Sequence, residues 1–342
     1  MVVICLPFFL ISICTYLVII RKGRVMKTSA RLENFPIMMF AIVMGMSGLS
    51  IAYQKASQLF HFTHVVPNVL AAVTSAIFVA VALTYLIKFL KYPQQVKEEF
   101  NHPVRINFFA AISISLLLLS VMFHPINHQI FVALWWIGML LQAYLTLHTI
   151  SFWINRNLEI NFSNPAWFLP IVGNVLVPVA GVEIVNRDFL MYFFSVGIFF
   201  WIILLTIILN RIIFHHVLAQ KFMPTLFIFI APPAVGMISY VKLTGEFDLF
   251  ASFLYNIGLF FTLLLLFMYK NFIKLEFFIS WWAFTFPLTA MTIASILAYH
   301  NTQSNFCYCA AIGLLILATC VVAFVAYKTL YHMMKKEICI IE

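Results

Sequence analysis

Charged residues are scarce in this sequence, and their scarcity excludes a soluble globular protein. Only 9% of the 342 residues are Asp, Glu, Lys or Arg, whereas 64% are hydrophobic and the mean hydropathy is +1.04. Soluble domains carry about 25% charged residues. No polar stretch is long enough to form a domain outside a membrane. The composition predicts an all-α integral membrane protein that crosses the bilayer several times.

Motifs for catalysis and metal binding are also missing. The chain has no Walker A motif, no H-E-x-x-H pair and no C-x-x-C pair among its six cysteines. His124 and His128 are four residues apart, but Pro125 lies between them and no acid is adjacent, so we expect no metal site there. We predict neither an enzyme nor a cofactor-dependent protein. Basic loops explain the net charge of +9 without a nucleic-acid partner.

Long apolar runs predict ten membrane-spanning helices within a single domain, residues 26–342. The predicted spans are about 34–53, 66–90, 104–122, 129–153, 165–182, 189–213, 222–242, 248–269, 277–299 and 304–327. Residues 1–25 form a further hydrophobic segment, but its basic residues follow the apolar run, which is the wrong order for a signal peptide. The segment is either an extra membrane helix or a gene-model extension ahead of Met26.

The basic residues predict the orientation of these spans. With residue 30 placed in the cytoplasm, 17 of the 20 Lys and Arg residues lie on the cytoplasmic side. The three on the other side are Lys55, Arg187 and Lys242. Because basic loops stay in the cytoplasm, we predict that both ends of the ten-helix body are cytoplasmic. The expected location is the cytoplasmic, that is inner or plasma, membrane.

The odd-numbered spans differ from the even-numbered ones. Prolines, glycines and hydroxyl residues recur in the odd spans, whereas the even spans are rich in Leu, Ile and Phe. This alternation predicts five helical hairpins that close into a quasi-fivefold ring, with the odd helices around a central pore and the even helices toward lipid. The candidate pore-lining residues are Gly45, Gly48, Ser113, Gly173, Asn174, Pro232, Gly236, Thr285, Thr289 and Thr292.

The ninth span carries the most informative pattern. Thr285, Thr289 and Thr292 share one helical face, with Phe286 beside them and Pro287 next in sequence. Such a helix indicates a lined and obstructed path. Hydroxyl residues also occur in ordinary packing between membrane helices, so packing is the alternative interpretation.

Ionisable residues are missing from the middle of every predicted span. All eleven acidic residues fall in loops or at span ends, and no Lys or Arg lies mid-span. Cation and proton-coupled transporters generally need a carboxylate inside the membrane. A path lined only by apolar and hydroxyl side chains, with a basic cytoplasmic rim, favours anions.

Short motifs, in order along the chain, resemble one known membrane family. They are Asn34-Phe35-Pro36 with Gly45 and Gly48, His102-Pro103-Val104-Arg105, Phe168-Leu169-Pro170 with Gly173-Asn174, Ala231-Pro232 and Trp282-Ala283-Phe284-Thr285-Phe286-Pro287. From about Asn34 to Lys328 the chain resembles the tellurite-resistance/dicarboxylate transporter (TDT) family, which includes TehA-like bacterial proteins and plant slow-type anion channels.

The resemblance implies a homotrimer in which each protomer has its own pore. It also implies that Phe286 plugs this pore as a gate. His102 and Arg105 are candidate cytoplasmic mouth residues, although a helix start and a topology anchor explain them equally well. Relatives often read Phe-Gly where this chain has Phe40-Ala41, so a methyl group narrows the pore if Ala41 faces it.

The predicted function is a channel or uniporter-like transporter for small anions such as chloride or nitrate. The alternative within transport is a carrier for C4-dicarboxylate, sulfite or tellurite oxyanions. A membrane scaffold without transport activity is a different class, but the short loops offer little surface for it.

Overall fold

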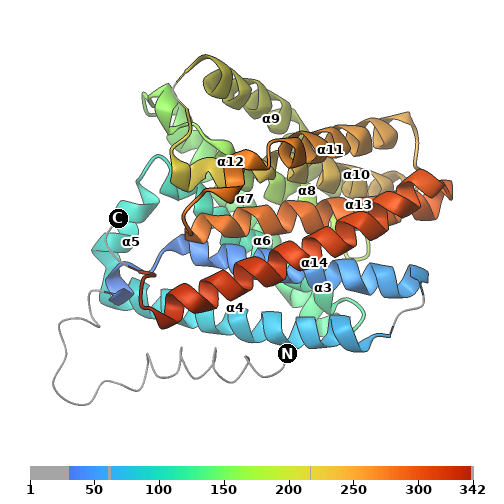
Figure 1. Cartoon of the computed structure of the whole chain (residues 1–342), viewed down its shortest axis with the longest axis horizontal. Helices are drawn as coiled ribbons and strands as arrows, with labels where there is room; N and C mark the ends of the chain where they lie inside the picture. The colour runs from blue at the N-terminus through green and yellow to red at the C-terminus, as the bar shows by residue number, and fades with distance from the viewer. Residues whose placement is uncertain (1–30, 61–62, 216, 340–342) are drawn as a thin grey trace.

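The computed structural model describes residues 31–60, 63–215 and 217–339. These residues fold into helices joined by short loops, and no strand occurs among them (Figure 1). The predicted all-α membrane fold is confirmed. The hydrophobic segment 1–25 lies outside the described residues.

Nine helices of the described chain are long and apolar enough to cross a membrane. The remaining predicted span, the fifth along the chain, is present as a shorter apolar helix, Pro165–Gly181. The α-helical parts of the ten spans are α3 (Phe40–Phe60), α4 (Val65–Lys91), α6 (Ala110–Phe123), α7 (His128–Ile154), α8 (Leu169–Gly181), α9 (Arg187–Phe214), α10 (Ala231–Thr244), α11 (Leu249–Phe267), α13 (Thr285–Thr302) and α14 (Asn305–Met334). Two short helices lie between spans, α5 (Pro93–Phe100) and α12 (Lys270–Ile273).

Every odd-numbered span begins with a 3-10 helix that runs directly into its α-helix. These starts are η1 (Ile37–Met39), η2 (Arg105–Phe109), η4 (Pro165–Phe168), η5 (Gln220–Ile230) and η6 (Ile279–Phe284). Proline explains part of this geometry, because it has no N–H for the carbonyl four residues earlier. Pro232 and Pro233 follow η5 in this way, and Pro287 follows η6. A sixth 3-10 helix, η3 (Ile160–Phe162), is a separate turn in the loop ahead of η4.

The odd spans form the interior of the protein and the even spans its exterior. In the four long odd spans, between 83% and 89% of the most apolar window is buried, against 28% to 39% in the even spans. The short fifth span is buried along almost its whole length. The predicted division into inner and outer helices is therefore confirmed.

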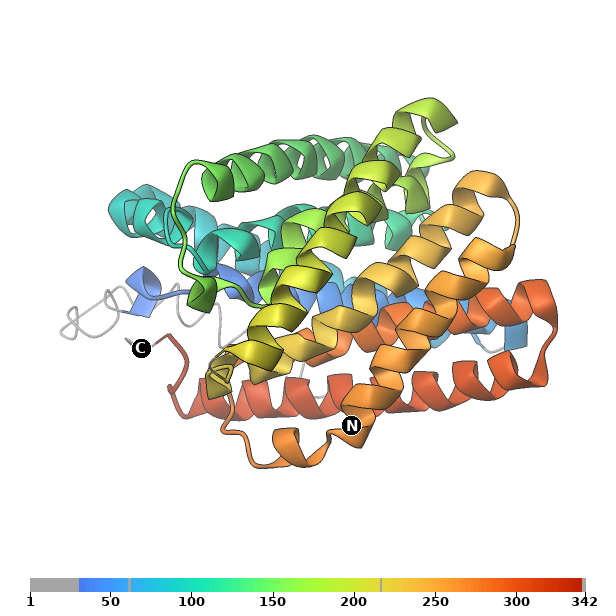
Figure 2. The ribbon, with the colours of Figure 1, turned by 90° about the horizontal axis from the view of Figure 1, so that it is seen from above.

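Contacts between helices follow the predicted hairpins. Each inner helix packs against the outer helix that follows it in sequence. The inner helices also contact one another in a closed cycle, α3, α6, α8, α10, α13 and back to α3. Figure 2 shows the outer helices α9 and α11 crossing this inner group. Quasi-fivefold symmetry and an ion path through the centre stay predictions.

Candidate functional site

A small cavity lies at the centre of the five inner helices. Its volume is about 30 Å³, which is room for about two water molecules. All five inner spans contribute to its wall. The lining residues are Met38, Ala41, Met44, Phe108, Ala111, Ile114, Leu169, Val172, Thr225, Ile228, Ala231, Ser280, Ala283, Phe286 and Pro287.

These lining residues recur at every third position. In the first span they are Met38, Ala41 and Met44, and the same spacing occurs in the other four. A 3-10 helix has three residues per turn, so every third side chain points in the same direction. The 3-10 starts place Met38, Phe108, Thr225, Ile228, Ser280 and Ala283 against the cavity, and the first turns of the following α-helices supply the other lining residues.

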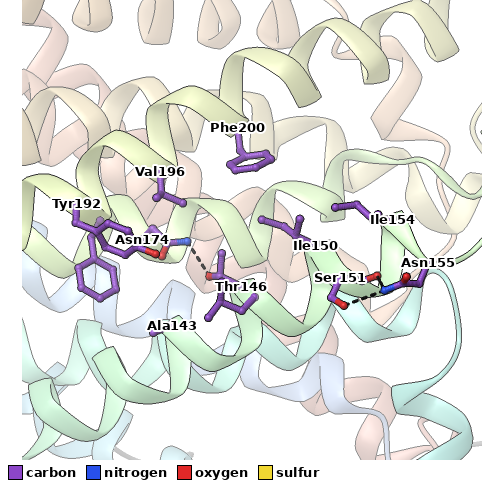
Figure 3. A pocket seen from close by; sticks show the side chains of 12 residues that line it. Ala143, Thr146, Ile150, Ser151, Ile154, Asn155, Asn174, Tyr192, Val196 and Phe200 are labelled. Carbon is purple, nitrogen blue, oxygen red and sulfur yellow. Dashed lines mark hydrogen bonds between the residues drawn. The ribbon is translucent and has the colours of Figure 1, made fainter.

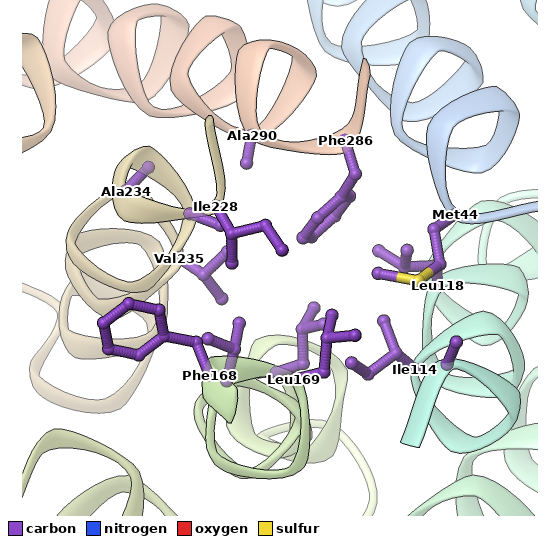
Figure 4. Close-up of a cluster of buried hydrophobic side chains, with 14 of the residues drawn as sticks. Met44, Ile114, Leu118, Phe168, Leu169, Ile228, Ala234, Val235, Phe286 and Ala290 are labelled. Carbon is purple, nitrogen blue, oxygen red and sulfur yellow. The ribbon is translucent and has the colours of Figure 1, made fainter. Parts of the chain in front are cut away.

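Phe286 projects from the start of α13 into this central space, and its ring lies between Ile228 and Met44 in the view of Figure 4. Its side chain is 5% exposed. Ile114, Leu169 and Ile228 surround the same space from the other inner spans (Figure 4). The gating role of Phe286 stays a prediction.

The cavity wall presents almost no polar group. Thr225 and Ser280 carry the only hydroxyl groups among the lining residues. Both hydroxyls donate to backbone carbonyls, of Phe222 and Lys221 respectively. An ion at Phe286 would therefore meet hydrocarbon on every side, which makes its dehydration costly.

The predicted threonine and glycine residues meet at a contact between α3 and α13. A Cβ atom added at Gly45 would collide with Thr285 Oγ1, and one added at Gly48 would collide with Thr289 Oγ1. The Thr285 hydroxyl donates to the Trp282 carbonyl, and that of Thr289 to the Phe286 carbonyl. None of the four lines the cavity at Phe286. Thr292 likewise donates to a backbone carbonyl within its helix, that of Leu288.

We expect Gly48→Ala to destabilise the protein by about 1–3 kcal/mol, because the added methyl overpacks the α3–α13 contact. Thr289→Ala in the same chain removes the hydroxyl that the methyl meets, so the double variant should recover part of the loss. Gly313→Ala is the control, because no atom lies within 4 Å of its added Cβ. Thermal unfolding in detergent measures the effect. Equal stability of Gly48→Ala and Gly313→Ala would contradict the packing interpretation.

Ser113, Gly173 and Asn174 meet in a hydrogen-bond network outside the cavity. Its centre is Gln142 of α7, whose Oε1 accepts from Ser113 Oγ (2.6 Å) and whose Nε2 donates to the Pro170 carbonyl (2.7 Å). Asn174 Nδ2 donates to Thr146 Oγ1 (2.8 Å) and to the same carbonyl (2.9 Å). A side chain at Gly173 would collide with Gln142. The sequence analysis missed Gln142, although a lone amide within an apolar outer span is a visible signal.

Asn174 and Thr146 also form the floor of an open groove of about 370 Å³ between α7 and α9 (Figure 3).

The two remaining predicted residues lie in α10. Pro232 is in its first turn, and a Cβ at Gly236 would contact Ile198 of the outer helix α9. Neither lines the cavity at Phe286. Their immediate neighbours Ala231 and Val235 face the centre instead (Figure 4).

His102 and Arg105 lie at the N-terminal end of the third span, the end predicted to be cytoplasmic. Arg105 begins η2 three residues before the lining residue Phe108, so it lies on the same face. His102 Nδ1 accepts from the backbone N–H groups of Val104 (3.1 Å) and Arg105 (3.3 Å). Burial, with the nearby charges of Arg105 and Lys221, lowers the pKa of His102 below its usual value. His102 is therefore a neutral cap, and the positive charge of this mouth comes from Arg105 and Lys221.

Comparison with known proteins connects this geometry to a family. A family model described as SLAC1, voltage-dependent anion channel, matches residues 34–330. The chain belongs to this family. The match covers all five hairpins, and the resemblance predicted from the short motifs is confirmed.

Individual members of the SLAC1 family show the same similarity. The chain is 31% identical over 279 residues to the S-type anion channel SLAH2 of Arabidopsis thaliana, which covers 79% of this chain and 54% of the relative. It is 26% identical over 312 residues to the guard cell S-type anion channel SLAC1 of the same plant, covering 88% and 56%. It is 27% identical over 301 residues to the tellurite resistance protein TehA homolog of Haemophilus influenzae, covering 87% and 90%. The chain thus spans about half the length of the plant relatives.

This SLAC1-family chain also contains a buried ion pair that the sequence analysis missed. Lys88 Nζ lies 2.9 Å from Glu99 Oε2, and the two side chains are 4% and 5% exposed. Tyr85 donates to the same carboxylate oxygen (2.9 Å), and the N–H of Ile37 donates to the other (2.9 Å). Lys88 also donates to the carbonyl of Phe35 (2.8 Å). These hydrogen bonds and the ion pair therefore connect α4 and α5 to the first residues of the first inner span.

Proposed function

We propose that this protein is a channel that conducts small inorganic anions, such as chloride and nitrate, passively through the central cavity, with Phe286 as its gate. The observation that carries the proposal is the position of the Phe286 ring, at the centre of an apolar space to which all five inner spans contribute. The printed names of the plant relatives, which are anion channels, support the ion class.

The dimensions of the cavity support a closed gate. A space of about 30 Å³ with an apolar wall holds too little water to hydrate an ion. An ion there would lose its hydration shell without gaining protein ligands. Rotation of the Phe286 side chain away from the centre would widen the space and lower this barrier.

The electrostatics favour anions over cations. Among the lining residues there is no carboxylate to bind a cation. Arg105 and Lys221 lie at the end predicted to be cytoplasmic, where they attract anions. Weak binding within an apolar path is compatible with high flux.

A carrier for C4-dicarboxylate, sulfite or tellurite oxyanions is the second candidate, which the name of the Haemophilus influenzae relative favours. The wall at Phe286 has no ammonium or guanidinium group to hold a dicarboxylate, and this supports the channel over the carrier. We also propose a homotrimer with one pore in each protomer, in the cytoplasmic membrane with both ends of the helical body in the cytoplasm.

Reversal potentials in planar bilayers test the proposal. The purified full-length chain should give a current that reverses near the chloride equilibrium potential under a KCl gradient, and nitrate should replace chloride. Empty bilayers are the control. A reversal potential near that of potassium would contradict anion selectivity. If the protein is silent while liposomes containing it accumulate labelled succinate, sulfite or tellurite, the carrier replaces the channel.

We expect Ala41→Gly to increase the anion conductance by up to about twofold, because Ala41 lines the cavity and its methyl narrows the path. Ala52→Gly is the matched control: it lies in the same helix, is fully buried and packs against α14. Each change replaces an alanine of α3 by glycine and lowers the stability of the helix by about 0.5–1 kcal/mol. Conductance in bilayers, with Phe286→Ala in both chains, measures the difference. Identical conductances would show that Ala41 does not limit the path.

A further inference from the structure

Lys55 and Lys242 lie near the C-terminal ends of the inner helices α3 and α10. Each lysine is on the helix face that lines the cavity closer to the N-terminal end of the same span. Lys55 follows Met44 by eleven residues in α3, and Lys242 follows Ala231 by eleven residues in α10. Eleven residues are three turns of an α-helix, so each lysine lies on the cavity-facing side, about 16 Å farther along its helix. We call this end of the inner helices the distal mouth.

Neither lysine is neutralised by a direct contact. Among the described residues, Lys55 and Lys242 have no hydrogen-bond acceptor and no ion-pair partner. Lys55 is half-buried and Lys242 is exposed. Lys55 lies within electrostatic range of Lys242, although α13 separates their helices in the cycle of contacts. The two ammonium groups therefore act on the same opening from different sides.

The carboxylate within electrostatic range of Lys55 is already paired, and Asp248, in the loop after Lys242, accepts from the Tyr240 hydroxyl. Glu183, just after α8, forms an ion pair with His124, just after α6. It also lies within electrostatic range of Lys55. Because His124 holds this carboxylate, Glu183 does not form a salt bridge with either lysine.

Membrane topology does not explain these lysines. The distal mouth is the side predicted to face away from the cytoplasm, where membrane proteins keep few basic residues. Only Lys55, Lys242 and Arg187 are predicted to lie on this side. Arg187 begins the outer helix α9, whereas both lysines lie on inner helices. Two of these three charges thus converge on the end of the central path.

We infer that Lys55 and Lys242 form a binding site for small monovalent anions at the distal mouth, from which the anion enters the central path. This inference rests on the proposed channel function. Ammonium groups are compact charges with rotatable N–H donors and impose no planar geometry, so the site accepts chloride and nitrate alike. Its field raises the local anion concentration at low salt and is screened at high salt.

Currents at two salt concentrations test the inference. The full-length chain with Phe286→Ala provides the open background, to which Lys55→Met, Lys242→Met or both are added. At about 20 mM KCl each single change should lower the conductance for anions entering from the distal side about two- to threefold, and the double change more. At 1 M KCl the differences should vanish, because the Debye length falls to about 3 Å.

Arg187→Gln is the matched control, because it removes one positive charge from the same side at an outer helix. It should leave the conductance unchanged, and Lys55→Arg should retain it. Unchanged conductance of both lysine variants at low salt, while Phe286→Ala conducts anions, would overturn this inference and leave the proposed function standing. An equal loss in Arg187→Gln would also overturn it. A folded Phe286→Ala protein that carries no current would overturn the proposed function together with the inference.

Discussion

Replacement of Phe286 by alanine is expected to raise the anion current of the reconstituted protein by at least about tenfold. The ring lines an apolar cavity of about 30 Å³, and its removal enlarges this space and lets water enter beside Met44 and Ile228. A reduction of the barrier by about 1.4 kcal/mol already gives a tenfold rate. Bilayer recordings of the two proteins at equal amounts measure the effect.

Phe284→Ala is the control for this prediction. Phe284 lies two residues earlier, is also buried, and packs against Phe227 (ring centroids 4.8 Å apart) and Phe272 (5.7 Å) rather than against the cavity. Its removal should destabilise the protein, since loss of a buried phenylalanine side chain costs about 3–5 kcal/mol. It should not open the path. Equal currents from wild type and a folded Phe286→Ala protein would refute the gate.

Replacement of Lys88 by methionine is expected to lower the free energy of unfolding by about 3–5 kcal/mol. The change leaves the Glu99 carboxylate buried without its counter-charge, although Tyr85 and the Ile37 N–H still donate to it. Glu99→Leu should have a comparable effect, because it leaves the Lys88 ammonium group buried. The double variant should recover much of the loss, since no uncompensated charge remains.

The exposed neighbour Glu98 provides the control for the ion pair. Its carboxylate accepts from Gln94 at the surface (3.2 Å), so Glu98→Gln should change stability by less than about 0.5 kcal/mol. Thermal unfolding in detergent, followed by loss of the monodisperse peak in size-exclusion chromatography, ranks the four variants. A Lys88→Met protein as stable as Glu98→Gln would show that the pair is not essential to the fold.

Most of the fold could be predicted because the sequence patterns that specify it extend over many residues. Apolar runs of about 20 residues define membrane helices whatever their partners. The alternation of proline-rich and leucine-rich spans also separated inner from outer helices correctly. The fifth span, Pro165–Gly181, is shorter than its nine companions, yet its apolar sequence was sufficient to identify it.

The face of each inner helix was harder to predict than the helix itself. An α-helical period of 3.6 groups Thr285 with Thr289, whereas the 3-10 starts have a period of three and bring Ser280, Ala283 and Phe286 to the cavity. The hydroxyl groups of Thr285 and Thr289 donate to carbonyls of their own span. These two threonines lie at the contact between α3 and α13, and mainly apolar side chains line the cavity.

The ion pair escaped prediction for a different reason. Lys88 and Glu99 are eleven residues apart and lie at the end of α4 and in α5. In sequence they look like ordinary charges beside a span. The Lys88 and Glu99 side chains are buried only because α5 folds back toward the first inner span. No local sequence pattern predicts this tertiary arrangement.

The short fifth inner span bears on how membrane voltage would act on the proposed channel. Pro165–Gly181 has 17 residues, including its four-residue 3-10 start, and reaches only about 27 Å. The outer helices α7 and α9, which pack against it, have 27 and 28 residues and reach about 40 Å. At this span the inner wall is therefore shorter than the outer helices beside it. In the proposed channel, the transmembrane voltage, about 2.3 kcal/mol per elementary charge at 100 mV, would act on a passing ion across the dry layer at Phe286.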